Sequence, residues 1–139
     1  MLRTHDLGRF VEAQAGSYDA AIAELRAGRK RTHWMWFVFP QIAGLGASPT
    51  ARRYAIASLD EARAYLADPV LGPRLVECSA ALLATEGRTA EQILGYPDDL
   101  KLRSSMTLFG RAVPEIELFQ QVLDRFYDGK PDPQTLNKV

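Results

Sequence analysis

The stretch RTHWMWFVFP, residues 31–40, places six bulky apolar side chains in a row between a histidine and a proline. Such a run is too short to cross a bilayer, which takes roughly 20 residues. A buried strand is one alternative, but no second segment of the chain offers it a partner strand. We therefore expect this segment to form the centre of the domain, helical at first and extended at Phe39, where Pro40 restricts the backbone.

The composition of the chain narrows its class. Its 139 residues suit one domain, and its 17 Lys and Arg balance its 17 Asp and Glu. Net charge therefore gives no general attraction to nucleic acid or to an anionic membrane. The first ten residues lack the apolar core of a secretory signal, and the single cysteine, Cys78, cannot form an internal disulfide. We expect a cytoplasmic protein with no membrane attachment.

Apolar residues recur at helical spacing along nearly the whole chain. Two clear stripes are Leu71, Leu75, Cys78 and Leu82, and Leu102, Met106, Phe109 and Val113. Helix starts are marked by Ser48 before Pro49 and by the pair Ser58 and Glu61. The sequence predicts an all-α fold: a compact, single-domain, multi-helical bundle of about seven helices without a significant sheet.

The whole chain, residues 1–139, is expected to be one domain. Its ordered core should span about residues 6–129. The last ten residues, 130–139, are polar and contain two prolines. Such a tail is either mobile or laid along the surface.

Two long blocks of the sequence carry a resemblance to a known family: LRAGRKRTHWMWFVFPQIAGLGASPTARRYAIASLDEARAYLADPVLGPRL, residues 25–75, and DDLKLRSSMTLFGRA, residues 98–112. They resemble a family of small, mainly bacterial proteins of unknown function whose members are often labelled "calpastatin". The resemblance extends from about Leu7 to the tail and implies a multi-helical domain, with no established reaction, cofactor or catalytic residue. The label itself conflicts with the sequence, because that inhibitor is a disordered polar chain and this chain has the apolar faces of a folded one.

Polar side chains border two strongly apolar segments. His33 precedes the aromatic run, where an imidazole can serve as a general base, an anion donor or a proton switch. Lys101 and Ser105 are four residues apart and share one helix face. Because one small domain must bury both segments together, we predict one pocket for a small anionic or nucleotide-like ligand. The residues assigned to this pocket are His33, Trp36, Lys101 and Ser105.

Each of these polar residues also has a structural interpretation, and both interpretations stay open. His33 can be hydrogen-bonded to a backbone carbonyl. Ser105 can bond to the carbonyl of Lys101 and allow close helix packing. A nucleophile pair of Ser105 and Lys101 is conceivable too, because a desolvated lysine can act as a base. The sequence therefore leaves open whether the protein is an enzyme.

Two further motifs invite a functional interpretation. AGLGASPT, residues 43–50, has glycines before a helix start, but Pro49 replaces the third glycine of a dinucleotide fingerprint, so turn glycines with a Ser-Pro cap are favoured. The basic run from Arg26 to Arg31 could contact nucleic acid, although a solvated helix end explains it equally well. We favour the helix end and expect no strong nucleic-acid binding. Two histidines without cysteine at ligand spacing predict no metal site, and no cofactor is indicated.

Three classes of function follow from these observations. The first is binding of a small anionic or nucleotide-like ligand in a pocket beside the His33–Trp36 segment. The second is a protein-interaction or regulatory module without catalysis. The third is weak nucleic-acid binding through the basic run. The sequence does not indicate the oligomeric state.

Overall fold

The structure is a computed structural model that describes residues 4–139. A short 3-10 helix and ten α-helices follow one another along this part of the chain. Their bounds are η1 (Thr4–Asp6), α1 (Gly8–Ala15), α2 (Tyr18–Arg26), α3 (Met35–Val38), α4 (Pro49–Arg53), α5 (Leu59–Ala67), α6 (Leu71–Ala84), α7 (Ala90–Leu94), α8 (Asp98–Ala112), α9 (Leu118–Tyr127) and α10 (Pro133–Leu136). Across residues 4–139, every helix is too short or too polar to pass through a lipid bilayer.

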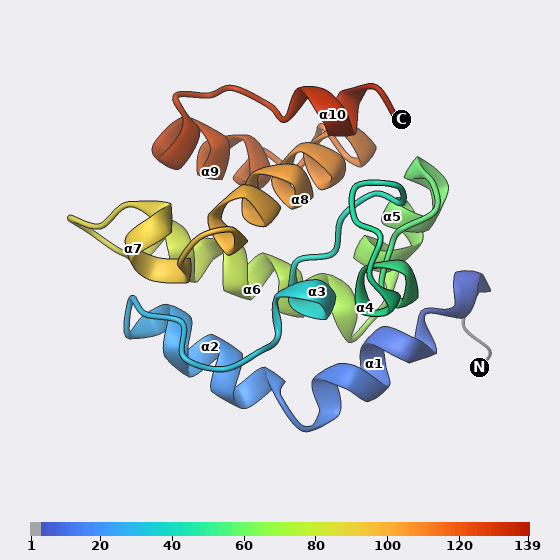
Figure 1. The fold of residues 1–139 in the computed structure, drawn as a ribbon, viewed down its shortest axis with the longest axis horizontal. Helices are drawn as coiled ribbons and strands as arrows, with labels where there is room; N and C mark the ends of the chain where they lie inside the picture. The colour runs from blue at the N-terminus through green and yellow to red at the C-terminus, as the bar shows by residue number, and fades with distance from the viewer. Residues whose placement is uncertain (1–3) are drawn as a thin grey trace.

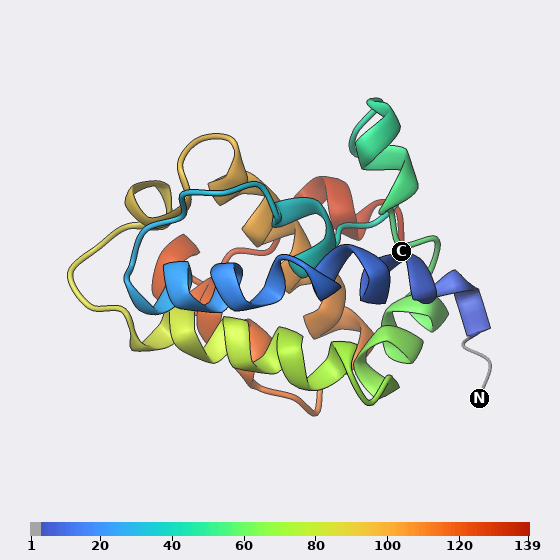
Figure 2. The same cartoon turned by 90° about the horizontal axis from the view of Figure 1, so that it is seen from below.

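Helix α6 lies in the middle of the bundle. It packs against α2 on one side and α9 on the other, while α5 packs against both α6 and α8. Figure 1 shows α6 between the α1–α2 pair and the α8–α9 pair, with α3 lying in the centre of the view. Seen from below, α2 runs alongside α6 (Figure 2). The predicted all-α fold is confirmed, with α1, α2, α5, α6, α8 and α9 as its longer helices.

An isolated parallel bridge between Ile42 and Ile56 closes the loop that follows the aromatic run. The amide of Ile56 donates to the carbonyl of Gln41 at 2.8 Å, and the amide of Ala43 donates to the carbonyl of Ile56 at 2.8 Å. No strand is present between residues 4 and 139. The bridge holds the two ends of this loop together, so α4 and the glycines before it project as one unit.

The expected helix caps explain where α4 and α5 begin. Ser48 Oγ accepts from the amide of Ala51 at 3.1 Å, with Pro49 in the first turn, and Ser58 Oγ accepts from the amide of Glu61 at 3.1 Å. These two predicted caps are confirmed. The carboxylate of Glu61 binds the amide of Ala57 at 2.8 Å instead of the amide of Ser58.

The aromatic run contributes a short helix, α3, as the sequence predicts. Phe39 follows it with φ −123° and ψ 73°, outside the extended region, so the expected extended conformation at this residue is wrong. Trp34 is 1% exposed and Phe39 is fully buried, so both side chains belong to the core. Trp36 and Phe37 are only half-buried, and the expectation that the run is buried on all sides is wrong for these two. The reason is that side chains point outward all around a helix, so a helix of four residues cannot turn every one of them toward the core.

The C-terminal residues lie along α8 and end in a helix of their own, α10. Asp132 caps this helix by accepting from the amide of Thr135 at 3.1 Å, and Pro133 occupies its first turn. The side chain of Thr135 is fully buried. Of the two alternatives for residues 130–139, the structure shows a tail laid along the body of the domain.

Candidate functional site

A cavity of about 370 Å³ lies where the start of α8, the tail and the loop after α3 meet. Its volume falls in the range of small-molecule sites. One part of its lining is apolar and includes Trp36, Ile42, Leu45, Tyr54 and Leu100. The other part is polar and includes Gln41, Lys101, Arg103, Ser104, Asp132 and Gln134. The cavity therefore offers an apolar wall and a charged wall to the same occupant.

Lys101 connects the two parts of the lining. Its Nζ lies 4.0 Å from the centroid of the Trp36 ring and 3.0 Å from Asp98 Oδ1. The other carboxylate oxygen of Asp98 is 2.9 Å from Nζ of Lys30, which in turn lies 5.3 Å from the centroid of the Trp34 ring. Two ammonium groups, each over a tryptophan, thus share one carboxylate. All three charged side chains are largely buried, with exposures of 9% for Lys30, 21% for Lys101 and 17% for Asp98.

The charged wall is built where α8 holds the tail. The Arg103 guanidinium donates to the carbonyls of Lys130 and Pro131, at 2.9 and 2.8 Å. Ser104 Oγ donates to Asp132 Oδ2 at 3.0 Å. That same oxygen also accepts from the amide and the hydroxyl of Thr135. Side chains that line the cavity are therefore the ones that fix the tail against α8.

Glu24 on α2 positions the segment that leads into α3. Burial raises the pKa of its carboxyl, but hydrogen bonds from Thr32, Arg31 and Trp34 outweigh burial and lower the pKa to about 2. The carboxylate therefore stays ionised at neutral pH. Its donors are the amides of Arg31 and Thr32, the hydroxyl of Thr32 and Nε1 of Trp34, at 2.6–3.0 Å. This anchor fixes the direction in which the aromatic run enters the core.

The structure brings together two of the four residues assigned to the pocket from the sequence. Trp36 and Lys101 line the cavity and contact each other. His33 lies exposed in the segment between α2 and α3 and is not part of the lining. Ser105 is fully buried, and its Oγ has no hydrogen-bond partner among the residues described. Ser104, the residue before it, takes the place in the cavity that the sequence assigned to Ser105.

The adjacent serines of α8 give a test of this assignment. Ser105→Ala removes an unpaired buried hydroxyl, so the free energy of unfolding should stay within about 0.5 kcal/mol of the wild type or rise. Ser104→Ala removes the hydrogen bond to Asp132, so the free energy of unfolding of this variant should fall by about 1–2 kcal/mol. Urea denaturation of the two variants measures the difference. An equal loss in both would contradict the placement of the two hydroxyls.

Several residues of the site were missed in the sequence, among them Lys30, Asp98 and Asp132. Lys30 was grouped with the basic run, yet its side chain is 9% exposed and turned toward Asp98, whereas Arg26 lies on the surface with Glu77 at 3.2 Å. A signal for Asp132 was present, because Asp132 before Pro133 repeats the cap pattern of Ser48 before Pro49. Nothing in the sequence pairs Lys30 with Asp98, which are far apart along the chain.

Other chemistry finds little support in the described part of the chain. Burial is the main reason that the pKa of the Cys78 thiol rises to about 12, so this thiol is a poor nucleophile. Within residues 4–139, no three His, Cys, Asp or Glu side chains are grouped so as to hold a metal ion. Nor does any hydrogen bond join Lys101 to Ser105 there, since Lys101 is bound to Asp98. The nucleophile pair considered from the sequence has no geometry to support it.

Comparison with known proteins places the chain in a family. The model of the family described as "Protein of unknown function (DUF1810)" matches residues 4–139. The chain belongs to this family.

The conserved hypothetical protein Rv1873 from Mycobacterium tuberculosis, whose crystal structure is known, is 55% identical to this DUF1810 chain. The match covers 96% of each chain with a TM-score of 0.95, so the DUF1810 fold described above also occurs in a solved structure. No curated protein matches the chain. The resemblance to a family of unknown function, noted in the sequence, is confirmed.

Proposed function

We propose that this protein binds a small anionic ligand in the cavity between Trp36 and Lys101. The observation that carries the proposal is the sharing of Asp98 by Lys30 and Lys101. One carboxylate cannot neutralise two ammonium groups, so a positive charge is left over. This charge lies beside the apolar wall of a cavity that is large enough for a small molecule.

A surplus charge in this position favours an anion for electrostatic reasons. Charges shielded from water interact more strongly than charges on an open surface, because the effective dielectric constant is lower. Lys101 also lies over the Trp36 ring, which keeps its ammonium group at the border of the cavity. An anionic group that enters would neutralise Lys101 without displacing Asp98 from Lys30. The apolar lining would receive the remainder of the ligand.

A thermal-shift measurement on the full chain tests this proposal. The probes are citrate, inorganic phosphate and a set of phosphate monoesters. A ligand at one hundred times its dissociation constant adds about 2.7 kcal/mol to stability, which would raise the melting temperature by several degrees. Lys101→Met keeps the length of the side chain and removes its charge. This variant should melt close to the wild type without ligand and should lose most of the ligand-induced rise.

Arg111→Met is the matched control for this experiment. Arg111 lies on the same helix, is exposed and does not line the cavity. Its removal changes net charge by the same amount, so a general charge effect would appear in both variants. If none of the probes stabilises the protein, or if Lys101→Met responds like Arg111→Met, the proposal is wrong.

A second candidate, an interaction module without catalysis, is favoured by one observation. Tyr96 and Leu100 are 69% and 50% exposed, and Leu100 forms part of the rim of the cavity. Exposed apolar side chains that gather at one place are common in interaction sites. The absence of binding by every small anion would favour this candidate. The two candidates share the same surface. Only the ligand-binding candidate predicts that Lys101→Met loses the stabilisation by small anions, so this variant separates the two.

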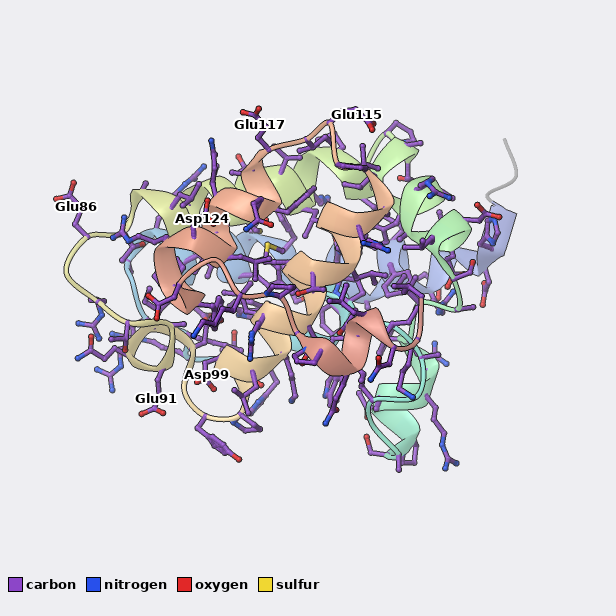
Figure 3. All side chains as sticks on the ribbon, turned by 90° about the horizontal axis from the view of Figure 1, so that it is seen from above. Glu86, Glu91, Asp99, Glu115, Glu117 and Asp124 are labelled. Carbon is purple, nitrogen blue, oxygen red and sulfur yellow. The ribbon has the colours of Figure 1, made fainter. Side chains whose placement is uncertain are left out.

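Nucleic-acid binding through the basic run remains the least favoured function. Lys30 is withdrawn from the run and Arg26 is paired with Glu77, which leaves fewer free cations than the sequence suggests. Figure 3 shows carboxylates distributed around the part of the molecule formed by α7, α8, α9 and the loops beside them. The labelled residues are Glu86, Glu91, Asp99, Glu115, Glu117 and Asp124. Acidic side chains in this region therefore interrupt any continuous basic surface that a phosphate backbone would need.

A further inference from the structure

More charged side chains surround the cavity than Lys30, Lys101 and Asp98 alone. Arg103 lines it, and Lys138 of the tail lies against Gly44, another lining residue: a β-carbon added to Gly44 would meet Nζ of Lys138 at 3.2 Å. The cations at or beside the cavity are Lys30, Lys101, Arg103 and Lys138, and the carboxylates are Asp98 and Asp132. Four positive groups against two negative ones leave two positive charges for a ligand to balance.

A phosphate monoester carries the matching charge. At pH 7 such a group has a charge of about −1.5 to −2 and three strong acceptor oxygens. The donors that could face it come from two elements: Lys101 and Arg103 from α8, and Lys138 from the tail. Because these two elements pack against each other, cationic groups from both border the same cavity, although Nε and Nη2 of Arg103 already donate to the tail carbonyls. A monocarboxylate would leave one of the two charges unbalanced.

The apolar part of the lining indicates the other half of the ligand. Trp36 and Tyr54 supply two aromatic side chains there, together with the apolar Leu45 and Leu100. Stacking of a flat base on an aromatic side chain is worth about 1–3 kcal/mol by alanine substitution. The amides of Gln41 and Gln134 also line the cavity, and each has donors and an acceptor for the edge of a polar ring. A flat ring with hydrogen-bonding edges suits this combination.

We infer that the ligand is a phosphate monoester that carries a flat, hydrogen-bonding ring, the build of a nucleoside monophosphate. The inference rests on the proposed function and specifies its ligand. The phosphate lies on the wall formed by α8 and the tail, and the ring lies on the wall formed by α3 and the loop that follows it. The tail contributes directly to this site through Asp132 and Gln134, and Lys138 lies against Gly44 of the lining.

Isothermal titration calorimetry of the full chain tests the inference with five kinds of probe. These are the 5′-monophosphates of adenosine, guanosine and uridine, the nucleoside adenosine, phenyl phosphate, inorganic phosphate and citrate. At least one ring phosphate should bind ten times more tightly than adenosine and ten times more tightly than inorganic phosphate. Lys101→Met should raise the dissociation constant of that ring phosphate at least tenfold, and Arg111→Met should leave it unchanged.

Trp36→Leu tests the position of the ring. This substitution removes the aromatic face but keeps an apolar side chain, so it should weaken the ring phosphate and leave inorganic phosphate unchanged. Circular dichroism shows whether the variant is folded. If it is not, Gln134→Ala, which changes an exposed residue of the lining, replaces it and should weaken the ring phosphate alone.

The outcomes separate this inference from the proposed function. Binding of citrate that depends on Lys101, without tight binding of any ring phosphate, overturns the inference and keeps the proposed function. Equal binding of adenosine and its monophosphate also overturns the inference, because the phosphate would then go unrecognised. No binding by any probe overturns both.

Discussion

Gly72→Ala should destabilise the protein by at least about 3 kcal/mol, because the added carbon has no space. A β-carbon at Gly72 would lie 2.0 Å from the carbonyl oxygen of Leu66 and 2.9 Å from its carbonyl carbon. Both contacts are with the backbone of α5, which cannot move away as the end of a flexible side chain can. Relief requires α5 and α6 to separate, and both helices are part of the packed core.

A melting curve followed by circular dichroism measures this effect, and a fall of roughly 10 °C is expected for a domain of this size. Gly110→Ala is the control. A β-carbon at Gly110, near the end of α8, would meet only Cβ of Phe119, at an ordinary 3.7 Å. Alanine favours the helix there by about 0.5–1 kcal/mol, so this variant should melt at or above the wild-type temperature. Similar melting temperatures for both alanine variants would show that α5 and α6 are farther apart than described.

Gly72 also shows what the sequence can and cannot predict about the fold. Gly72 and Pro73 predict that the helix announced by Asp68 and Pro69 begins up to one turn late, and α6 begins at Leu71. The need for glycine has another cause, which is the close approach of Leu66 from the preceding helix. Helical spacing and caps are local properties, so the sequence reveals them. The distance between two helices depends on the whole bundle and leaves no local pattern.

The tail illustrates a signal that was present but not used. Polar composition and two prolines predict a tail that is either mobile or laid along the surface. Asp132 followed by Pro133 is nonetheless the same kind of helix start as Ser48 followed by Pro49. The buried hydroxyl of Thr135 then completes the cap by donating to Asp132 at 2.6 Å. The composition of the tail predicts only that it is polar, whereas the Asp-Pro cap pattern also predicts a helix in it.

Two of the four residues assigned to the pocket from the sequence, Trp36 and Lys101, line the cavity, and the other two do not. Lys101 was assigned to the pocket because it is a charge at the border of an apolar segment, and Trp36 because it belongs to the aromatic run that follows His33. The choice of Ser105 over Ser104 depended on the rotation of α8, and one residue turns a helix by about 100°. Ser104 therefore faces Asp132 and the cavity, while Ser105 faces the core. A stripe of apolar residues fixes the rotation of a helix only approximately.

The two tryptophans of the aromatic run have different roles, although the sequence presents them alike. Trp34 is 1% exposed, its ring lies 6.2 Å from that of Phe39, and its Nε1 donates to Glu24 at 3.0 Å. Trp36 is half-buried, lines the cavity and has Lys101 over its ring. The first side chain belongs to the core and the second to a wall that a ligand can reach.

Trp34→Ala should therefore cost about 3–5 kcal/mol, the range for a large aromatic side chain removed from a core. The substitution leaves a cavity next to Phe39 and removes one of the donors to the Glu24 carboxylate. Trp36→Ala should cost less, about 1–2 kcal/mol, because part of the ring already contacts solvent and the lost contact with Lys101 is worth about 0.5–1 kcal/mol. Urea denaturation of both variants gives the two values under the same conditions. A larger loss for Trp36→Ala would reverse the assignment of core and wall, since the ring that carries stability would then be the one placed beside the ligand.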